Sequence, residues 1–136
     1  MDIGRATTFI AANPRAVLAT TRADGRPQLS PVVAAVDDAG RVLVSTRETS
    51  IKAKNLTRDS RASLCVLNDR FFGEWIQAEG HAELIHLPEA LPILEDYYRR
   101  ISGEHPDWED YRAAMRREKR LVVRITIERA GPDVSG

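Results

Sequence analysis

The chain is poor in several residue types that mark specialised classes of protein. It has a single cysteine, Cys65, so an internal disulfide is excluded, and its cysteine content is compatible with a reducing compartment. Acidic and basic residues are balanced at 20 each, so no global field draws the chain toward nucleic acid or anionic lipid. No apolar run is long enough to cross a bilayer, and the first residues lack the apolar segment of a secretory signal. We therefore expect a cytoplasmic protein that binds neither nucleic acid nor membranes.

Histidine is also scarce, with three residues in the chain. His81 and His86 lie five positions apart in an expected strand, and this spacing places their side chains on opposite faces. They cannot form the compact pair of ligands that a bound transition metal requires. We expect no metal site.

Apolar periodicity, by contrast, is clear along the chain and predicts six strands and four helices. The strands are expected over residues 16–22, 27–36, 41–46, 61–68, 75–87 and 120–130. The helices are expected over residues 3–13, 50–57, 88–102 and 106–118. The length of 136 residues is that of a single domain, 1–136, whose last residues, 131–136, are expected to form a flexible tail.

Local signals describe how these strands should be arranged. Asp24 and Gly25 both tolerate a positive φ, so the first two strands should form a hairpin. Pro31 lacks the N–H that a central strand needs, which places its strand at an edge or at a bulge. Gly80, inside the long fifth strand, predicts a bend. With the first three strands as a meander, we expect a small closed or partly closed antiparallel barrel.

The stretch STRETSIKAKNL (residues 45–56) gathers hydroxyl groups and two of the three lysines where an expected strand leads into an expected helix. A helix N-terminus presents free N–H groups and the positive end of the helix dipole, so it readily accepts phosphate or carboxylate. Lys52 lies in the first turn and can add its charge, whereas Lys54 points elsewhere. The alternative is a solvated cap followed by an exposed basic helix face. The residues alone leave both interpretations open.

Four segments carry a resemblance to a known family: RPQLSPV (26–32), RVLVSTRETSIKAKNLTRDSRASLCVL (41–67), WIQAEGHAEL (75–84) and RLVVRITIERA (120–130). In this order they resemble the pyridoxamine-phosphate-oxidase-like family of flavin- and deazaflavin-binding proteins, and within it the branch that uses coenzyme F420. The resemblance implies a mainly β fold with flanking helices, a six-stranded antiparallel split β-barrel. It also implies a homodimer that binds its cofactor in the subunit interface.

The positions that match cofactor-binding residues of the family fall into three groups. The strand that supports the tricyclic ring is matched by Gln28, Ser30, Pro31 and Val32. The strand end and the phosphate-binding turn are matched by Ser45, Thr46, Ser50 and Lys52. The far wall of the pocket, often contributed by the partner subunit, is matched by Trp75 and Gln77.

The function implied by the resemblance is that of an oxidoreductase. Reduced coenzyme F420 would supply a hydride to an unsaturated, planar conjugated small molecule, while the protein supplies orientation and excludes water. No side chain is assigned as an acid or base, although Tyr98 and His81 are candidates for a proton donor.

Two alternatives stay open, FMN as the cofactor and a carrier of flavin, deazaflavin or haem without turnover. FMN-using pyridoxamine phosphate oxidases usually have arginine before the phosphate-binding lysine, where this chain has Ile51. They also carry a basic C-terminal segment that has no match here. Oxidation of pyridoxamine phosphate is therefore not expected, and F420 is favoured over FMN.

Overall fold

A computed structural model describes residues 1–132 of the chain. The strands in this range are β1 (Arg15–Thr21), β2 (Pro27–Val33), β3 (Ala35–Val36), β4 (Val42–Arg47), β5 (Arg61–Leu67), β6 (Trp75–Ile85) and β7 (Arg120–Gly131). The helices are α1 (Ile3–Ala12), α2 (Ile51–Arg58), α3 (Ala90–Ser102) and α4 (Trp108–Arg117). All four helices and the predicted strand regions are confirmed, with shifts of a few residues at their ends.

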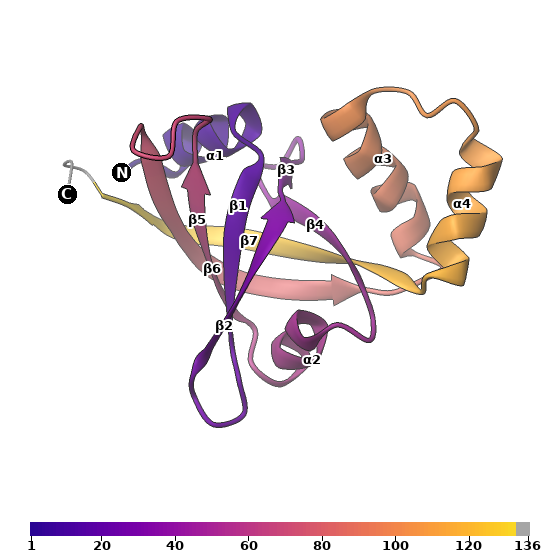
Figure 1. The fold of residues 1–136 in the computed structure, drawn as a ribbon, viewed down its shortest axis with the longest axis horizontal. Helices are drawn as coiled ribbons and strands as arrows, with labels where there is room; N and C mark the ends of the chain where they lie inside the picture. Colours follow the sequence, from indigo (N-terminus) through magenta and orange to yellow (C-terminus); the bar gives the residue numbers. More distant parts are fainter. Residues whose placement is uncertain (133–136) are drawn as a thin grey trace.

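The strands form one antiparallel sheet in the order β2-β1-β5-β6-β7-β4-β3, and this sheet curls into a half-barrel (Figure 1). The fold is therefore mainly β with flanking helices, as predicted, but residues 1–132 form seven strands where six were expected. The expected strand 27–36 is broken at Ala34, whose buried N–H donates to the Pro14 carbonyl at 2.7 Å.

That break also corrects the predicted meander. Before Ala34 the chain pairs with β1 as β2; after it, the chain pairs with β4 as β3, at the opposite edge of the sheet. Along its whole length β4 pairs with β7 instead of β2. The chain thus crosses from one sheet edge to the other, and this crossing brings the two edges of the curled sheet together.

The sharp curvature of β6 depends on a glycine. The register between β6 and β7 shifts at Glu79 and Gly80, which is the signature of a bulge. A Cβ at Gly80 would collide with the main-chain carbonyl of Thr126 on β7. The predicted bend at Gly80 is confirmed, and the absent side chain is what allows the two backbones to approach.

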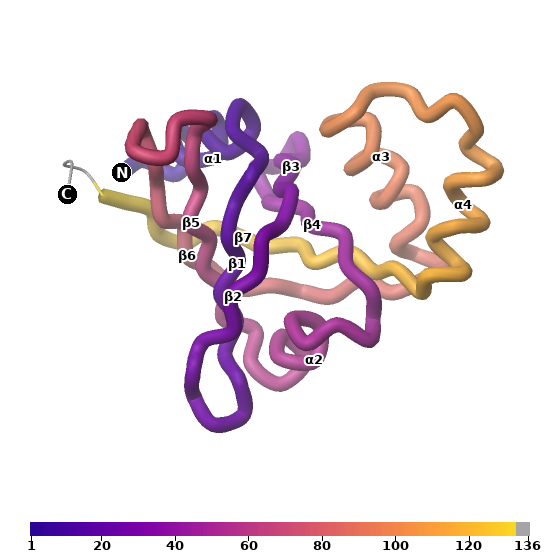
Figure 2. The backbone as a smooth tube through the Cα atoms, viewed as in Figure 1, coloured from indigo at the N-terminus to yellow at the C-terminus, as the bar shows by residue number. Residues whose placement is uncertain are grey.

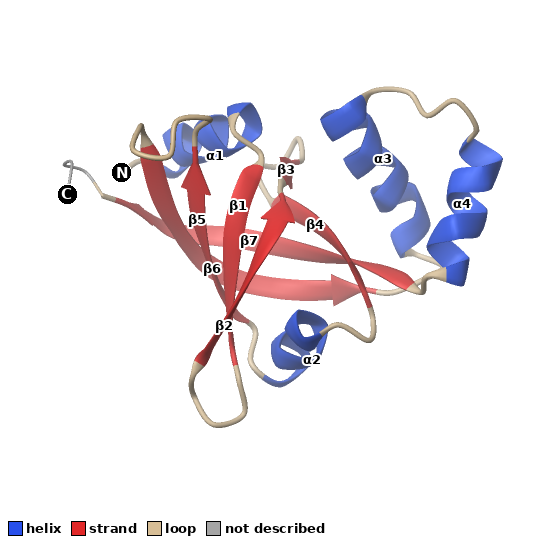
Figure 3. Ribbon diagram, in the orientation of Figure 1, coloured by secondary structure: helices blue, strands red, loops and turns tan. Residues whose placement is uncertain are grey.

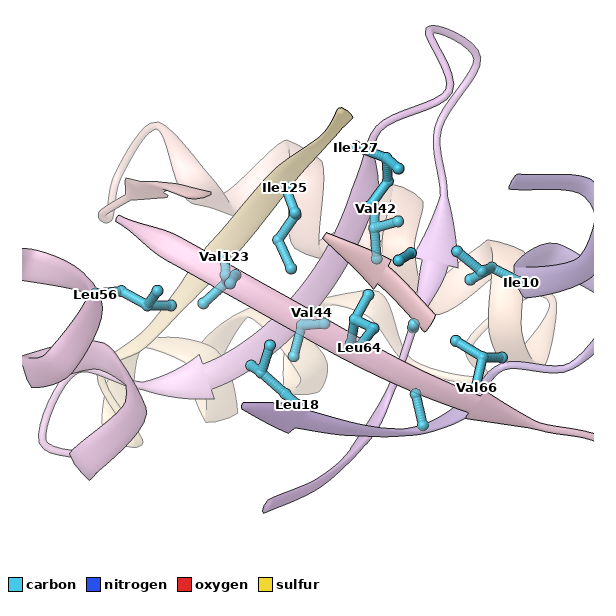
Figure 4. Close-up of a cluster of buried hydrophobic side chains, with 14 of the residues drawn as sticks. Ile10, Leu18, Val42, Val44, Leu56, Leu64, Val66, Val123, Ile125 and Ile127 are labelled. Atoms are coloured by element: carbon cyan, nitrogen blue, oxygen red, sulfur yellow. The ribbon is translucent and has the colours of Figure 1, made fainter. Parts of the chain in front are cut away.

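The main core lies inside the curl of the sheet. Leu121, Val123, Ile125 and Ile127 alternate along β7 and point into it, as their spacing predicts. Figure 4 shows Ile10 of α1 and Leu56 of α2 reaching this cluster from opposite ends. Cys65 is half-buried on the other face of β5, outside this core.

A second cluster lies on the outer face of the sheet, where α3 and α4 pack against it (Figure 3). It contains Val122 of β7, Leu94 of α3, and Tyr111 and Met115 of α4. Tyr98 packs here with the rings of Trp108 and Tyr111, at centroid distances of 5.7 and 5.2 Å. The apolar positions of both helices thus pack in one cluster, as their helical spacing predicts.

The two ends of the described chain lie close together, as the backbone trace shows (Figure 2). The Met1 ammonium group donates to the Ala130 carbonyl of β7 at 3.2 Å. Gly131, predicted to open a flexible tail, is the last residue of β7 and pairs with Gln77; residues 133–136 lie outside the described range. Within residues 1–132, no helix combines the length and apolar character needed to cross a membrane.

Candidate functional site

The predicted anion-binding turn is built as a capped helix start. Ser50 is the N-cap of α2: its Oγ accepts a hydrogen bond from the Ala53 N–H at 3.1 Å. Thr46, at the end of β4, donates its hydroxyl proton to the same Ser50 oxygen at 3.1 Å. These bonds fix the turn between β4 and α2 and place Lys52 in the first helical turn, as the sequence predicted.

A buried asparagine holds the other end of α2 against the sheet. Asn55 donates to the Thr20 hydroxyl on β1 at 3.0 Å and accepts a bond from Arg58 at 3.0 Å. Arg58 also donates to the Thr21 carbonyl at 2.6 Å. Since a buried amide left without these partners would be costly, α2 has one favoured position at the open end of the curled sheet.

A cleft of about 600 Å³ opens where β2 faces β4, and its lining also includes Lys52 of α2 and Tyr97 of α3. We call the gap between β2 and β4, which approach each other without sharing a ladder, the seam. The cleft is lined by Arg15, Ala16, Pro31, Val32, Val33, Ser45, Thr46, Lys52, Tyr97 and Arg120. Five predicted site residues therefore line one cleft, and Ser50 stands directly behind Thr46.

The cleft is electropositive. Its lining includes three cationic side chains, Arg15, Lys52 and Arg120, and no aspartate or glutamate. Arg120 is hydrogen-bonded to Glu118 at 2.9 and 3.1 Å, and Arg15 lies 3.8 Å from exposed Asp69. Lys52 has no hydrogen-bond or ion-pair partner among residues 1–132. Partial burial, together with repulsion by Arg120, lowers the pKa of its ammonium group.

Two polar groups on the inner face of β2 also lack partners. Gln28 Oε1 and Ser30 Oγ are buried and make no hydrogen bond within the described part of the chain. Both lie on the same face of β2 as Val32, which lines the cleft. Because most buried polar atoms in proteins are hydrogen-bonded, these two require an explanation.

Trp75 and Gln77, predicted for the far wall, do not reach this cleft in the single chain. They lie on β6, which β1 and β5 separate from β2. The pairing register nevertheless aligns Gln77, Cys65, Val17 and Pro31 in one row across the outer face of the sheet. At the usual spacing of strands, Gln77 and Pro31 are roughly 14 Å apart along that row.

The two candidate proton donors also lie elsewhere. Tyr98 belongs to the aromatic cluster between α3 and α4. His81 lies on β6, where its ring nitrogens contact the Ser60 hydroxyl at 2.8 Å and the Glu128 carboxylate at 3.6 Å. Neither side chain lines the cleft.

Sequence reasoning missed five residues of the cleft: the apolar Ala16 and Val33, and the polar or charged Arg15, Tyr97 and Arg120. Arg120 begins β7 directly opposite Arg47 of β4, and Tyr97 reaches the cleft from α3. Their local patterns are those of a strand start and of a helix surface. Only the pairing of β4 with β7 and the docking of α3 place them beside Lys52.

Comparison with known structures identifies proteins of similar fold. A conserved hypothetical protein from Mycobacterium tuberculosis is 30% identical, with 100% of this chain and 92% of that chain covered and a TM-score of 0.76. A protein named F420 reductase is 18% identical, with 90% and 93% covered and a TM-score of 0.68. The heme storage protein of Vibrio cholerae is 15% identical, with 96% and 94% covered and the same TM-score.

The last two similarities show a shared fold only, whereas the sequence comparison is more specific. Residues 4–132, nearly the whole chain, match the family described as pyridoxamine 5'-phosphate oxidase. That family includes oxidoreductases. The chain belongs to the pyridoxamine 5'-phosphate oxidase family.

Proposed function

We propose that this protein is an oxidoreductase that binds reduced coenzyme F420 in the cleft between β2 and β4 and reduces an unsaturated, planar small molecule. The observation that carries the proposal is the unpartnered Lys52 ammonium at a capped helix start, in a cleft with three cations and no carboxylate. Glu118 and Asp69 pair with Arg120 and Arg15, so Lys52 is the cation of the cleft that the described residues leave unneutralised, and a phosphate or carboxylate would complete the site.

The residues present fit a ligand that combines an anionic tail with a planar polar ring. Lys52, Arg120 and Arg15 would hold the anionic part. Pro31 and Val32 offer an apolar edge for the ring, and no neighbouring strand needs the N–H that Pro31 lacks. The unpartnered Gln28 and Ser30 atoms lie on the same strand but are buried and do not line the cleft, so their side chains would have to rotate to reach polar groups at the ring's edge.

When bound, the coenzyme supplies the hydride; the protein's own contribution is binding and orientation. The Ser50 cap and the Asn55 anchor fix α2, so Lys52 is preorganised before any ligand arrives. Burial of the cleft's inner residues excludes water from that side: Thr46, for example, is 4% exposed.

F420 is preferred over FMN because of the residue beside Lys52. Ile51 is 55% exposed at the start of α2, so an apolar side chain stands where FMN-using relatives commonly have a cation. The loss of one phosphate ligand weakens a coenzyme with a single phosphate more than one with further anionic groups. The fold shared with a protein named F420 reductase supports this choice.

The rival function is a carrier that binds cofactor without turnover, and the fold shared with a heme storage protein favours it. Haem iron is usually held by His, Cys, Met or Tyr side chains. Within the described residues, the cleft offers only Tyr97 among these, and that hydroxyl is engaged with the Val33 carbonyl. Turnover of reduced F420 with a panel of unsaturated acceptors separates the enzyme from the carrier.

The proposed active form is a homodimer. Leu29 is 61% exposed, and Val33 and Trp75 are 39% and 37% exposed, all on the outer face of β2-β1-β5-β6. A second copy on this apolar face would cover it and would bring its own Trp75 and Gln77 toward the cleft. This arrangement accounts for two predicted site residues that lie apart from the cleft in the single chain.

The test is to measure the dissociation constants of F420 and FMN side by side for the wild type and for Lys52→Ala. Removing a hydrogen bond to a charged group costs about 1.5–3 kcal/mol, so we expect F420 binding to weaken roughly 10- to 150-fold. Lys54→Ala is the matched control, since Lys54 lies on the same helix but does not line the cleft. Unchanged affinity in Lys52→Ala, or equal losses in both variants, would refute the assigned anion site.

A further inference from the structure

Tyr97 occupies a special place in the barrel, at the end of the seam. From α3 its side chain enters the cleft, and its hydroxyl donates to the carbonyl of Val33, the last residue of β2, at 2.8 Å. On the other side of the seam lies β4, whose Ser45 lines the same cleft. A side chain from outside the sheet thus bridges two edges that share no ladder.

The electrostatic surroundings of the Tyr97 hydroxyl indicate that β2 and β4 both lie close to it. Burial raises the pKa of its phenol, while Arg120 and the Ser45 backbone act in the opposite direction. The hydroxyl therefore stays protonated near neutral pH and keeps its bond to Val33. Its ring is the only aromatic group that lines the cleft within residues 1–132.

A hydrogen bond to the sheet also anchors helix α3 close to Tyr97. Arg100, one turn along, donates to the Val36 carbonyl at 2.9 Å and to Asp38 and Asp96 at 3.0 and 2.8 Å. On its other side Tyr98 packs into the aromatic cluster with α4. Consecutive tyrosines therefore serve different purposes, Tyr98 in packing and Tyr97 at the cleft.

We propose that Tyr97 is a specificity-determining residue whose ring contacts the planar part of the bound coenzyme and limits how deeply it enters the seam. This inference rests on the proposed function, because it assumes that the cleft binds a ligand with an anionic tail and a planar ring. The cations would hold the tail, and Tyr97 would select for the ring. Aromatic contacts of this kind strengthen binding about 2- to 12-fold beyond the effect of the area they bury.

The test compares ligands with and without a ring. Dissociation constants for F420, FMN and inorganic pyrophosphate are measured for the wild type, Tyr97→Phe, Tyr97→Leu and the control Tyr98→Phe. For Tyr97→Leu we expect about tenfold weaker binding of both coenzymes, with pyrophosphate affinity within about twofold of wild type. Tyr97→Phe keeps the ring and should lose no more than about threefold, and Tyr98→Phe should bind all three probes normally.

The outcomes separate the inference from the function on which it rests. If the wild type binds pyrophosphate but neither coenzyme, the proposed function fails and the inference fails with it. If the wild type binds the coenzymes and Tyr97→Leu binds them equally well, only the inference is overturned. It is also overturned if Tyr97→Leu weakens pyrophosphate as much as the coenzymes, since Tyr97 would then act only by holding the shape of the cleft.

Thermal unfolding of each variant establishes that the comparison is made between folded proteins. Tyr97 is half-buried, and leucine is a good helix former, so a large loss of stability is not expected. Tyr97→Met keeps more of the side chain's reach without a ring and provides the same comparison if the leucine variant does not fold.

Discussion

Lys52 illustrates how a proposed binding group can oppose the stability of the fold that carries it. Its pKa is lowered because the protein partly buries the ammonium group and places Arg120 near it. Compared with the unfolded chain, the folded state therefore disfavours this charge. An anion-binding site is expected to lower the stability of the ligand-free protein in this way, since its cation gains a favourable partner only when the ligand binds.

We expect Lys52→Met to raise the melting temperature of the ligand-free protein at pH 7, because it removes a disfavoured charge and keeps the aliphatic contacts. The lowered pKa also sets a pH dependence. The ammonium is lost as pH rises through its pKa, so coenzyme affinity in the wild type should fall at a lower pH than an ordinary lysine would give. Melting curves and dissociation constants from pH 7 to 10 measure both effects. An affinity profile that Lys52→Met reproduces would contradict this assignment.

Gly80 is needed at its position because it has no side chain. A Cβ there would meet the Thr126 carbonyl of β7, which is backbone and cannot rotate away. We expect Gly80→Ala to lower the free energy of unfolding by about 1–3 kcal/mol, as for other overpacked sites. Gly131→Ala is the control, because a Cβ at Gly131 meets nothing within 4 Å. Denaturant unfolding of the two variants measures this loss. Equal free energies of unfolding would show that the fold does not need a glycine at the bulge.

At the scale of elements, each segment near the cleft is fixed by bonds to a partner distant in sequence. Helix α2 is tied to β1 by Asn55, and α3 is tied to β3 by Arg100. The α3–α4 hairpin is held by the buried Tyr111, whose hydroxyl donates to the Leu94 carbonyl at 2.8 Å. Stability of this hairpin is therefore a condition for placing Tyr97.

Ionisation of Tyr111 limits the stability of the α3–α4 hairpin at alkaline pH. Burial, the main cause, raises the pKa of its phenol to about 12, whereas an exposed tyrosine titrates near 10. The folded state thus holds its proton more tightly than the unfolded chain, and this contribution is complete below about pH 10 and lost as pH rises toward 12.

We expect Tyr111→Phe to be less stable than the wild type by about 1 kcal/mol at pH 8, through loss of one buried hydrogen bond. Between pH 10 and 12 the difference should shrink, because only the wild type has the Tyr111 phenol to ionise. Urea unfolding of both proteins at pH 8 and at pH 11 measures it. Parallel stability curves over this range would argue against a buried, protonated Tyr111.

For the whole molecule, the outer face of β2-β1-β5-β6 is the feature that a single chain leaves unexplained. It exposes Leu29, Val33 and Trp75, and it carries the row from Pro31 to Gln77. We expect the wild type to be a dimer in solution and Leu29→Glu to shift it toward monomer, since a buried unpaired charge is costly at an interface.

Light scattering coupled to size-exclusion chromatography measures this shift. Ile3→Glu serves as the control, because Ile3 is an exposed apolar residue on α1, which is not one of the strands that form this face. Monomeric wild type, or a Leu29→Glu variant as dimeric as the wild type, would remove this face from the proposed interface. Weaker coenzyme binding in a monomeric Leu29→Glu would connect the interface to the cleft.

The sequence by itself determined what depends on neighbours along the chain. Periodicity located the helices and strand regions, Ser50 specified a helix cap, and Gly80 and Pro31 marked a bulge and an edge. The order of the motifs further indicated the family, whereas residues 45–52 by themselves left an anion site and a solvated helix cap both open. These features are local because backbone geometry, capping and side-chain alternation act over a few residues.

Only the tertiary structure decided which distant segments meet. The break at Ala34 sends the chain across to the other sheet edge, and the pairing of β4 with β7 brings Arg120 beside Lys52. The docking of α3 adds Tyr97, which no local pattern distinguishes from its neighbour Tyr98. Strand order and helix docking are set by how the whole sheet curls to bury its core, so the composition of the cleft follows from packing across the molecule.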